Sequence, residues 1–585
     1  METADKAHVI RVLREIAVLL QVKGENAFKS RAYEIAADRL AGSQEDLATL
    51  VQQNRLQEIP GIGSALSEKI SELVRTGKMA YHDQLKAQYP PGITELMKVP
   101  DLGPKKAALL WEQLGIGDVD GLEKACKAQQ LRGLKGFGEK SESKILAGIE
   151  VYRRAVSEPD RRRLGDVLAI AEEILNQVQK IPFVKRAALG GSVRRFRETV
   201  ADVDLIASAD PAHIQAVMKA FSAHDQVREV LASGDSKTSV RLFKGDLQVD
   251  LRVVPDEDFA TALHHFTGSK AHHIRLRGLA QDRGLKISEW GVHRGEEKLP
   301  VPDERALYEL LGMQYVPPEL REDWGEVEAA LQRQLPEDLI SMGDIAGNVH
   351  SHSTWSDGRN SLEEMANTAR AMGLRYYTVT EHSQSAGYAG GLTYDRLQRQ
   401  WAEIDALNEK LVPHGFRLLK GIESDILEDG RLDYPDSVLE KLEVVIGSIH
   451  VRHGLDEEGM TKRVLAAFDN PHLHILGHPT GRLINERAAY GLKMEAVLDR
   501  AAERGVAIEV NGSPHRMDIK ADYVRMALQR GVRLVASTDA HATSELSFLT
   551  YSVGTARKGW ARRSDILNTR SADEFVATLR SMRRH

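Results

Sequence analysis

Two acidic residues one position apart, with arginines just ahead of them, could together bind a nucleotide and its metal ions. The stretch is GGSVRRFRETVADVDL, from Gly190 to Leu205, and its acids are Asp202 and Asp204. If the acids lie on a strand, its period of two places both carboxylates on one face. The charges could instead cancel as surface ion pairs, or the carboxylates could face water at a strand end.

A third carboxylate, Asp250, lies in a second apolar run, LQVDLRVV. Burying three like charges together is costly unless a divalent cation occupies the site. Mg²⁺ is usually held by a few carboxylates and substrate phosphates, and two such ions can activate a 3′-hydroxyl and stabilise a departing pyrophosphate. Apolar residues flank each acid, so the water-facing alternative is disfavoured. The residues predicted to hold the phosphates of a nucleoside triphosphate are Gly191, Ser192 and Arg195.

In the C-terminal half, histidines and acids follow one apolar run after another, beginning with NVHSHSTWSDG. The carboxyl ends of the strands of a βα barrel converge on one face. Nitrogen and oxygen ligands without thiolate suit Mn²⁺, Zn²⁺ or Fe²⁺, and such ions make a hydroxide that attacks a phosphoester. A lone histidine would be an ordinary core or surface residue, but a set at successive strand ends is not. The predicted ligands are His350, His352, Asp357, His382, Glu423, His450, His478, Asp539 and His541.

A helix–glycine–helix unit repeats three times between about residues 56 and 150, as LQEIPGIGSALSEKI, LMKVPDLGPKKAALL and LRGLKGFGEKSESKI. Free N–H groups at the start of the second helix bind a phosphate without reading a base. A plain helical hairpin with a glycine C-cap is the alternative. Three copies, each followed by Lys or Ser, favour contact with the DNA backbone. The glycines predicted to make it are Gly61, Gly63, Gly103, Gly136 and Gly138.

The elements that must position these residues follow from hydrophobic periodicity. Residues 1–50 predict helices, and residues 160–300 alternate short apolar strands with helices. The proline- and acid-rich stretch 300–340 predicts a linker. After residue 344 a long α/β alternation begins.

Composition narrows the class of protein. A chain of 585 residues is too long for one core, and its one cysteine, Cys126, excludes a disulfide framework and a thiolate metal cluster. There is no long apolar leader and no run of 18 apolar residues, so we expect a cytoplasmic protein with no membrane partner. The formal net charge is −6 and no region is basic as a whole. DNA binding would therefore depend on local patches and backbone amides.

The motifs, in this order, resemble the family X DNA polymerases, the DNA polymerase beta group. GSVRR followed by DVD and a third Asp matches their palm, and HHFTGSKAHHIRLRGLAQDRGLKISEWGV is similar to their Tyr-Phe-Thr-Gly-Ser segment and the helix behind it. A GS…DxD match alone could mean any nucleotidyltransferase, but the ordered set over residues 1–320 is specific. The C-terminal ligand set resembles the polymerase-and-histidinol-phosphatase (PHP) domain, with no position missing.

The resemblance implies roles for individual residues. Asp202, Asp204 and Asp250 match the metal carboxylates, and Lys69 matches a lysine that forms a Schiff base with a sugar aldehyde. A solvated helix lysine is the alternative for Lys69. The other matches are Ser192 and Arg195 to the triphosphate binders, Phe266 and Gly268 to the wall beside the sugar, and Arg277 to a contact with the template minor groove.

Four positions depart from the family pattern. His265 replaces a tyrosine, so sugar discrimination could differ. Lys270 stands where the beta enzyme has Asp, and a cation there could add affinity for the nucleotide. Ala65 replaces a helper lysine near Lys69, and Glu34 replaces an arginine. The resemblance implies a possible deoxyribose phosphate lyase activity at Lys69, although the last two replacements remove cations that would assist it.

The expected fold is multidomain α+β and α/β, with a helical N-terminal region of helix-hairpin-helix motifs, a nucleotidyltransferase palm and a C-terminal PHP βα barrel. The expected domains are 1–80, a helical lyase-type DNA-binding domain; 81–155, a helix-hairpin-helix fingers-type domain; 156–260, the palm; 261–320, a nucleotide-selecting polymerase lobe; 321–343, a linker; and 344–585, a PHP phosphoesterase domain.

The function that follows from the resemblance is DNA-directed DNA synthesis that fills short gaps in DNA repair, with a metal-dependent 3′-5′ exonuclease or 3′-end phosphoesterase in the PHP domain. We expect two Mg²⁺ or Mn²⁺ in the palm and two or three Mn²⁺, Zn²⁺ or Fe²⁺ in the PHP domain. The expected partners are gapped or primer-template DNA and dNTPs, bound by a nucleoid-associated monomer.

Two other classes stay open. The chain could be a phosphatase of a small phosphoester that its polymerase half tethers to DNA, or a non-catalytic scaffold at DNA ends. A scaffold needs neither the carboxylate triad nor the ligand set, so both argue against it.

Overall fold

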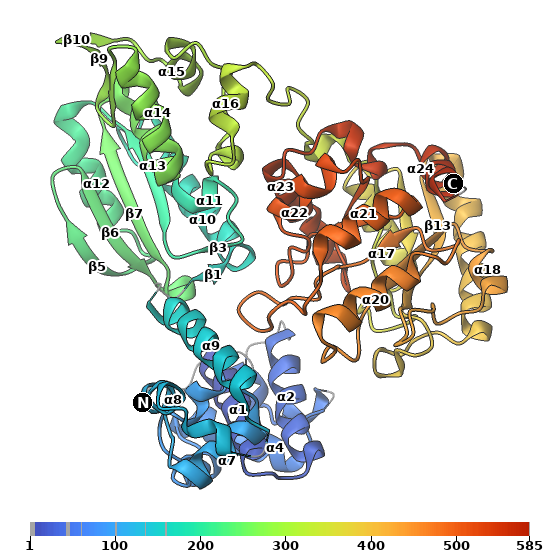
Figure 1. The fold of residues 1–585 in the computed structure, drawn as a ribbon. Coiled ribbons are helices and arrows are strands. Elements are labelled where there is room, and N and C mark those ends of the chain that lie inside the picture. Colours follow the sequence, from blue (N-terminus) through green and yellow to red (C-terminus); the bar gives the residue numbers. More distant parts are fainter. Residues whose placement is uncertain are drawn as a thin grey trace. The chain divides into compact units, whose positions relative to one another are not determined.

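The computed structural model describes residues 6–42, 47–59, 61–99, 102–134, 136–157 and 161–583. The chain divides into two compact units, Met1–Asp160 and Arg161–His585, which are described separately here (Figure 1).

The described residues of the first unit form helices and turns without a strand. Its core contains Leu13, Ile16 and Leu20, which face inward at helical spacing. The helices are α1 (Lys6–Val22), α2 (Ala27–Gly42), α3 (Leu47–Gln52), α4 (Ser64–Thr76), α5 (Ala80–Lys86), α6 (Ile93–Leu96), α7 (Pro104–Leu114), α8 (Val119–Lys127) and α9 (Glu139–Ser157), with short 3₁₀ turns at Leu56–Glu58 and Gln130–Gly133.

The second unit opens with a five-stranded mixed sheet, the palm, in the order β2-β4-β7-β6-β5. Neighbours pair antiparallel except β4 and β7, which are parallel. A two-stranded ribbon of β1 and β3 lies beside it. The elements are β1 (Arg162–Arg163), α10 (Leu164–Gln179), β2 (Arg186–Leu189), α11 (Gly191–Arg194), β3 (Thr199–Val200), β4 (Val203–Ser208), α12 (Ile214–Ser222), β5 (Val227–Ser233), β6 (Lys237–Leu242) and β7 (Gln248–Val254).

Alternate residues of β4 and β7 face opposite sides of the palm sheet. Val203, Leu205, Val249 and Leu251 are fully buried against α10 and α12. Ile206 on the opposite parity packs with α13 on the other face. Residues 204 and 250 share that parity, so the acids predicted at these positions face the α13 side.

A lobe of helices and a three-stranded antiparallel sheet follows the palm. Its own core includes Leu276, Leu307 and Leu311. The elements are α13 (Phe259–Thr267), α14 (Lys270–Asp282), β8 (Lys286–Ser288), β9 (Gly291–Arg294), β10 (Glu297–Leu299) and α15 (Glu304–Leu310).

The stretch 321–343 is built differently from the predicted linker. It contains α16 (Glu326–Leu331), and Val327, Ala330 and Leu335 join the core of the preceding lobe. Arg321 and Glu326 are fully buried, because each pairs with an oppositely charged or hydrogen-bonding partner. Part of the charge in this stretch therefore lies in buried pairs, and the linker prediction is wrong for this part.

The C-terminal part is a barrel of seven parallel strands in sequence order, β11 to β17, with helices around the outside (Figure 1). The segments that follow the first and last strands meet through a parallel bridge between Ser351 and Ala540. The strands are β11 (Gly347–Asn348), β12 (Tyr376–Val379), β13 (Arg417–Asp425), β14 (Val444–Ser448), β15 (Ile475–Leu476), β16 (Ala507–Asn511) and β17 (Leu534–Ser537). This arrangement agrees with the predicted βα barrel.

The helices between these strands keep to the outside, whereas the last helix packs Phe575 and Leu579 against strand residues such as Tyr376 and Ile446. The helices are α17 (Leu362–Ala371), α18 (Tyr394–Leu411), α19 (Asp436–Leu439), α20 (Glu457–Ala467), α21 (Met494–Arg504), α22 (Ala521–Gln529), α23 (Leu549–Lys558) and α24 (Ala572–Met582).

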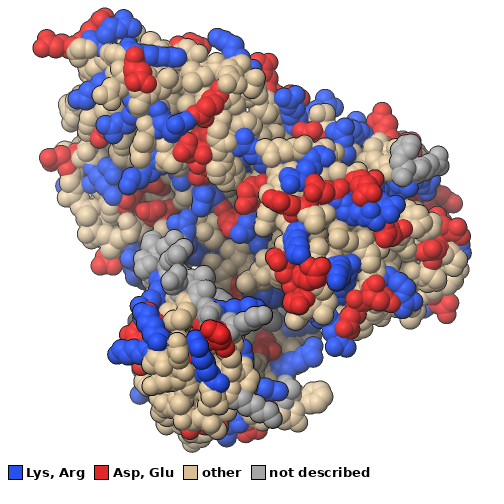
Figure 2. Space-filling model, in the orientation of Figure 1, with Lys and Arg blue, Asp and Glu red and all other residues tan. Residues whose placement is uncertain are grey.

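The surface charge is mixed. On the face drawn in Figure 2, Lys and Arg are interspersed with Asp and Glu on both units, which agrees with the slightly negative net charge. Among the described residues, none of the helices has the length and apolar character that crossing a membrane requires.

Candidate functional site

Three carboxylates meet on the α13 face of the palm. Asp204 and Asp250 are register partners on the parallel strands β4 and β7. Asp202 precedes β4 by one residue, slightly outside the strand on which we expected it. Sequence reasoning missed Lys237 on β6, whose amine forms an ion pair with Asp250. The structure thus brings the three predicted acids together and places one cation beside them.

The three carboxylates repel one another when no cation lies between them. Burial, then the neighbouring Asp202 and Asp250, raises the pKa of Asp204 to about 7. Burial, then Asp250, also raises the pKa of Asp202. Burial alone would raise the pKa of Asp250, but hydrogen bonds from Lys237, Gln248 and Ser239 lower it instead. A divalent cation would relieve the repulsion, so the residues fit the predicted metal site.

The Gly-Ser turn before these strands lies against the carboxylates. Gly191 begins α11 with φ of 56°, and a Cβ there would lie 2.0 Å from an oxygen of Asp204. Only glycine fits this close approach. Ser192 follows in the same short helix.

Arg195 extends from this turn to the next predicted loop. Its Nη1 donates to the carbonyl of Thr267, and its Nε lies 3.3 Å from Glu322. A Cβ on Gly268, whose φ is 72°, would lie 2.9 Å from Nη1 of Arg195. The predicted triphosphate arginine and the predicted sugar-wall glycine are therefore in contact.

The remaining predicted nucleotide residues surround that loop. The ring of His265 lies 4.8 Å from that of Phe266 and 4.9 Å from that of His273, centroid to centroid. Arg252 of β7 stacks on Phe266, with its guanidinium carbon 4.0 Å from the ring centroid. Lys270 is exposed at the first turn of α14.

The predicted template contact lies on the outer face of α14. Arg277 is exposed there and lines an open surface depression together with Ile274, Gln281 and Lys286. Ile274 is 61% exposed, so a cation and an apolar side chain are both available to a duplex on this face.

In the first unit, each predicted hairpin glycine lies in the turn before a helix. Gly63 and Gly103 are the N-cap residues of α4 and α7, with extended backbones, and α9 starts directly after Gly138. Gly61 and Gly136 have φ of 94° and 90°, a region that favours glycine. Each turn thus leaves free N–H groups at a helix start, as predicted.

Lys69 lies on α4 between two tyrosines of the first unit. Its amine is 4.7 Å from the ring centroid of Tyr81 and 5.9 Å from that of Tyr33. Glu34, one of the departures from the family, accepts a hydrogen bond from Gln21 at 2.7 Å. The lysine is therefore held against aromatic faces.

All nine predicted ligands of the barrel gather at the carboxyl ends of its strands. Glu423 lies at the centre and is almost fully buried. Its carboxylate oxygens are within 2.9–3.6 Å of a ring nitrogen of five histidines, namely His350, His352, His382, His450 and His478.

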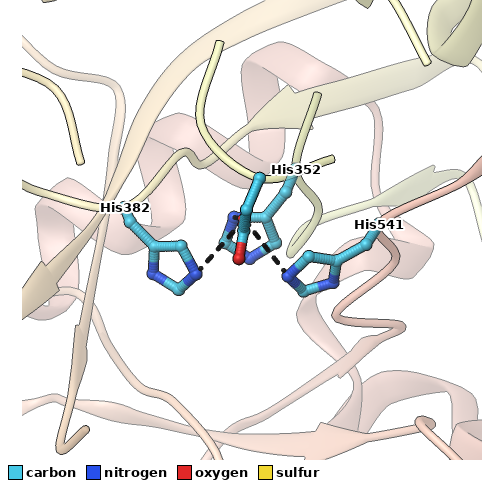
Figure 3. A group of neighbouring side chains, drawn as sticks. His352, His382 and His541 are labelled. Carbon is cyan, nitrogen blue, oxygen red and sulfur yellow. Dashed lines mark ion pairs between the residues drawn. The ribbon is translucent and has the colours of Figure 1, made fainter. Parts of the chain in front are cut away.

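Two aspartates and a sixth histidine complete the set. Asp357 lies 3.6 Å from His382 and 3.4 Å from His541, and the rings of these two histidines lie on either side of that of His352 (Figure 3). Asp539 lies 3.4 Å from His352. Three overlapping groups could each hold an ion: His352, Asp357, His382 and His541; His350, His352 and Glu423; and His382, Glu423 and His450.

The donor atoms fit metal ions better than hydrogen bonds. Nε2 of His350 and both ring nitrogens of His352 are buried without a hydrogen-bond partner. Burial, together with neighbouring His541 and His382, lowers the pKa of His352 to about 3, which keeps its ring neutral as a ligand must be. Buried polar atoms of this kind require a partner, and a cation supplies it.

Sequence reasoning missed the residues that orient these ligands. Glu509 is buried in β16 and accepts from Nδ1 of His350 at 2.6 Å, and Asp425 accepts from Nδ1 of His450 at 2.5 Å. Glu381 accepts from the backbone and hydroxyl of Ser353, near Asp357. An acid inside an apolar strand, as in VAIEVNG, was the available signal.

One arginine reaches the rim of the metal-ligand set. Nε of Arg516 lies 3.2 Å from Asp539, and the side-chain amide of Asn511 donates toward Asp539 at 3.4 Å. The side-chain carbonyl of Asn511 accepts from the backbone N–H of Ser513 at 2.9 Å. Asn511 is fully buried, whereas Arg516 is partly exposed. This favours loop ordering for Asn511 and leaves Arg516 available to a substrate phosphate.

Family comparisons match four stretches of the chain. A helix-hairpin-helix domain matches residues 4–79, a SAM-like helix-hairpin-helix tandem 93–150, a DNA polymerase beta thumb 262–322 and a PHP domain 348–513.

Individual relatives cover either the whole chain or its C-terminal part. The chain is 40% identical over 578 residues to the DNA polymerase/3′-5′ exonuclease PolX of Bacillus subtilis (strain 168), which covers 98% of this chain and 99% of that protein. It is 29% identical over 234 residues to a probable phosphatase of Thermoanaerobacter sp. (strain X514). That alignment covers 38% of this chain and 89% of the relative.

Proposed function

The chain belongs to the family X DNA polymerases that carry a PHP domain, and from this premise we propose how its two centres act. It is a DNA polymerase with a 3′-5′ exonuclease or phosphoesterase activity, and it uses divalent metal ions, DNA and dNTPs. We propose that the palm fills short gaps during repair and that the barrel trims or cleans 3′ ends.

The pairing of Asp204 with Asp250 across β4 and β7 is the observation that best supports synthesis in the palm. We propose that these acids and Asp202 hold two Mg²⁺ or Mn²⁺ ions. Bound there, the ions would lower the pKa of the primer 3′-hydroxyl and neutralise the departing pyrophosphate.

The protein groups then position the reactants. Gly191 and Ser192 present backbone N–H groups to the β- and γ-phosphates, and Arg195 adds a cation to them. Phe266 and Gly268 form the wall beside the sugar, and His265 takes the place of the family's tyrosine there. Arg277 contacts the duplex from α14, and the hairpin glycines hold the DNA backbone.

The barrel supports hydrolysis of a phosphoester. We propose that its nine ligands hold two or three Mn²⁺, Zn²⁺ or Fe²⁺ ions, which would supply a hydroxide nucleophile. Glu509 and Asp425 fix the rings of His350 and His450. Arg516 at the rim is the residue that we propose binds the phosphate next to the scissile bond.

Further parts of the proposal concern the whole chain. We propose that it acts as a monomer at the nucleoid, since its substrate is DNA, and that its domains have the predicted bounds up to residue 320, with 321–343 belonging to the preceding lobe. We do not extend the proposal to a lyase activity at Lys69, because Ala65 and Glu34 replace the cations that would assist it.

A gapped duplex labelled at the primer 5′ end separates the two activities. With dNTPs and Mg²⁺ or Mn²⁺, Asp204→Ala should lose primer extension by at least about 10³-fold, because it removes a carboxylate of the palm centre. It should keep shortening the primer, because the barrel centre is unchanged. His350→Ala should lose shortening and keep extension.

Equal loss of both activities in either variant would contradict separate centres. A small phosphomonoester tests the alternative hypothesis that the chain is a phosphatase tethered to DNA by its polymerase half. Faster release of phosphate from it than of nucleotides from the primer would favour a phosphatase tethered to DNA, an outcome to which the similarity with probable phosphatases points.

A further inference from the structure

A lysine of the barrel reaches the predicted triphosphate arginine of the palm. Lys558 is the last residue of α23, and its amine donates to the backbone carbonyl of Arg195 at 3.0 Å. The same amine donates to the carbonyl of Glu319 at 3.2 Å and lies 2.6 Å from the carboxylate of Glu322. Its three donors are therefore shared between the palm turn and the C-terminal end of the polymerase lobe.

Glu322 is the common acceptor of this cluster. Besides Lys558, it faces Nε of Arg195 at 3.3 Å and Nη1 of Arg197 at 3.4 Å. The side chains of Glu322 and Lys558 are only 6% and 7% exposed, so water screens the charges little. Burial, only partly offset by Glu322, lowers the pKa of Lys558 to about 8. One buried carboxylate thus faces three cations.

The same helix holds the palm turn by packing. The ring of Phe196, which follows Arg195, lies directly over Gly554 of α23, where a Cβ would be 2.2 Å from a ring carbon. Tyr551, one turn earlier, lies 6.2 Å from that ring, centroid to centroid. Helix α23 therefore contacts both the backbone and the side chains of the turn that carries Arg195.

We infer that Lys558 of the barrel is a positioning residue for nucleotide binding in the palm, where it holds Glu322 so that Arg195 stays available to a triphosphate. This inference rests on the proposed polymerase function. It gives the C-terminal barrel a part in DNA synthesis that is independent of its metal centre.

The effect follows from charge balance. Without the amine, the carboxylate of Glu322 would be neutralised by Arg195 and Arg197 alone, and would draw both guanidinium groups away from an incoming anion. The loss of one positive charge at about 10 Å from a triphosphate weakens its binding roughly tenfold at an effective dielectric constant of about 20. The loss should appear in the KM for dNTP, because the metal carboxylates are untouched.

The test uses the full chain with a one-nucleotide gap and measures kcat and KM for the matching dNTP. Lys558→Met should raise KM about tenfold and change kcat less than about twofold. Binding of the same dNTP to the gapped complex in Ca²⁺, measured by equilibrium dialysis, should weaken by the same factor. Gly554→Ala, which displaces Phe196, should raise KM independently.

Two further variants separate positioning from docking and folding. Arg557→Met removes the adjacent contact of α23 with Glu319 at 3.0 Å but leaves Glu322 alone, so KM should stay at the wild-type value. The double change Lys558→Met with Glu322→Gln removes one positive and one negative charge, so the net charge of the cluster stays that of the wild type. It should restore KM to within about threefold of wild type. Shortening of the primer by the barrel serves as the internal measure of folding.

The outcomes are distinguishable. Wild-type protein that does not extend the primer contradicts the proposed function. Wild-type protein that extends it, with an unchanged KM in Lys558→Met, overturns this inference alone. A rise in KM that Arg557→Met reproduces, or that the double variant does not relieve, would assign Lys558 a docking role instead and likewise overturn it.

Discussion

At the scale of single residues, Glu509 shows that the predicted metal ligands depend on other residues that orient them. Its two oxygens accept from His350, from the hydroxyl of Ser537 at 2.5 Å and from the backbone of His478 at 2.5 Å. These contacts fix the ring of one ligand and the chain position of another. A buried carboxylate against a ligating histidine also raises the basicity of the ring.

Glu509→Gln should therefore weaken metal binding in the barrel by about 10–100-fold, because the amide loses the charge and cannot accept from every donor. Mn²⁺ binding measured by equilibrium dialysis, in an Asp202→Ala/Asp204→Ala background that removes the palm ions, provides the readout. Glu574→Gln, an exposed cap of α24, is the matched control. Equal affinity in both variants would contradict an orienting role for Glu509.

The nine ligands could be predicted from the sequence because each follows an apolar run, and parallel strands bring their carboxyl ends together. The residues that orient them could not. Glu509, Asp425 and Lys237 are single charged residues in or beside strands, and their partners are more than ten residues away in the chain. Pairing of that kind depends on the register of the strands, which periodicity does not fix.

At the scale of elements, α16 and the residues before it show where the composition led to a wrong prediction, that of a linker. Arg321 is fully buried, bonds to Glu304 at 2.6 Å and donates to the carbonyl of Val316. Glu326 accepts from His272 at 2.5 Å. Charged residues usually lie at the surface, so a run of them predicts a solvated segment. Here Arg321 and Glu326 each have a buried partner supplied by another element.

This pairing predicts a pH dependence of stability. Burial would raise the pKa of Glu304, but Arg321 and Arg194 outweigh it and lower the pKa from 4.5 to about 2. Since the folded-state pKa is depressed, the stabilisation is present above pH 4.5 and is lost as the pH falls toward 2. The shift corresponds to ~3 kcal/mol.

Glu304→Gln should accordingly lower the thermal unfolding temperature at pH 7, with a difference from wild type that shrinks steadily between pH 4.5 and pH 2. Differential scanning calorimetry at four pH values measures it. Glu309→Gln, on the exposed side of the same helix α15, should match wild type throughout. A difference for Glu304→Gln that stays constant with pH would show that the loss comes from packing.

At the scale of the whole molecule, synthesis and hydrolysis share one compact unit, and each centre concentrates like charges or unpaired donors that a cation must satisfy. The two centres use different donor sets. The proposed ligands of the palm are all carboxylates, whereas six of the nine proposed ligands of the barrel are imidazoles. Imidazoles bind Mn²⁺ and Zn²⁺ more tightly than Mg²⁺.

Removal of metal should therefore destabilise the protein mainly through the barrel. Treatment with EDTA should lower the unfolding temperature, and Mn²⁺ at about 100 times its Kd should restore ~2.7 kcal/mol, or ~5–10 °C. The restoration should persist in Asp202→Ala/Asp204→Ala and fall sharply in His350→Ala/His352→Ala, as followed by calorimetry. An equal response in the two double variants would contradict the barrel as the main site.

The closure of the barrel also sets the order in which the centre can be assembled during translation. His350 and His352 belong to the first part of the barrel to be synthesised, whereas Asp539 and His541 are synthesised only after its last strand. The two segments are joined by the bridge between Ser351 and Ala540 and by the hydrogen bond from the backbone N–H of Asp539 to the carbonyl of His350 at 3.0 Å. A nascent or prematurely terminated chain therefore lacks a complete ligand set. Hydrolytic capacity is withheld until synthesis of the polypeptide is nearly finished, when the palm that precedes it has already been made.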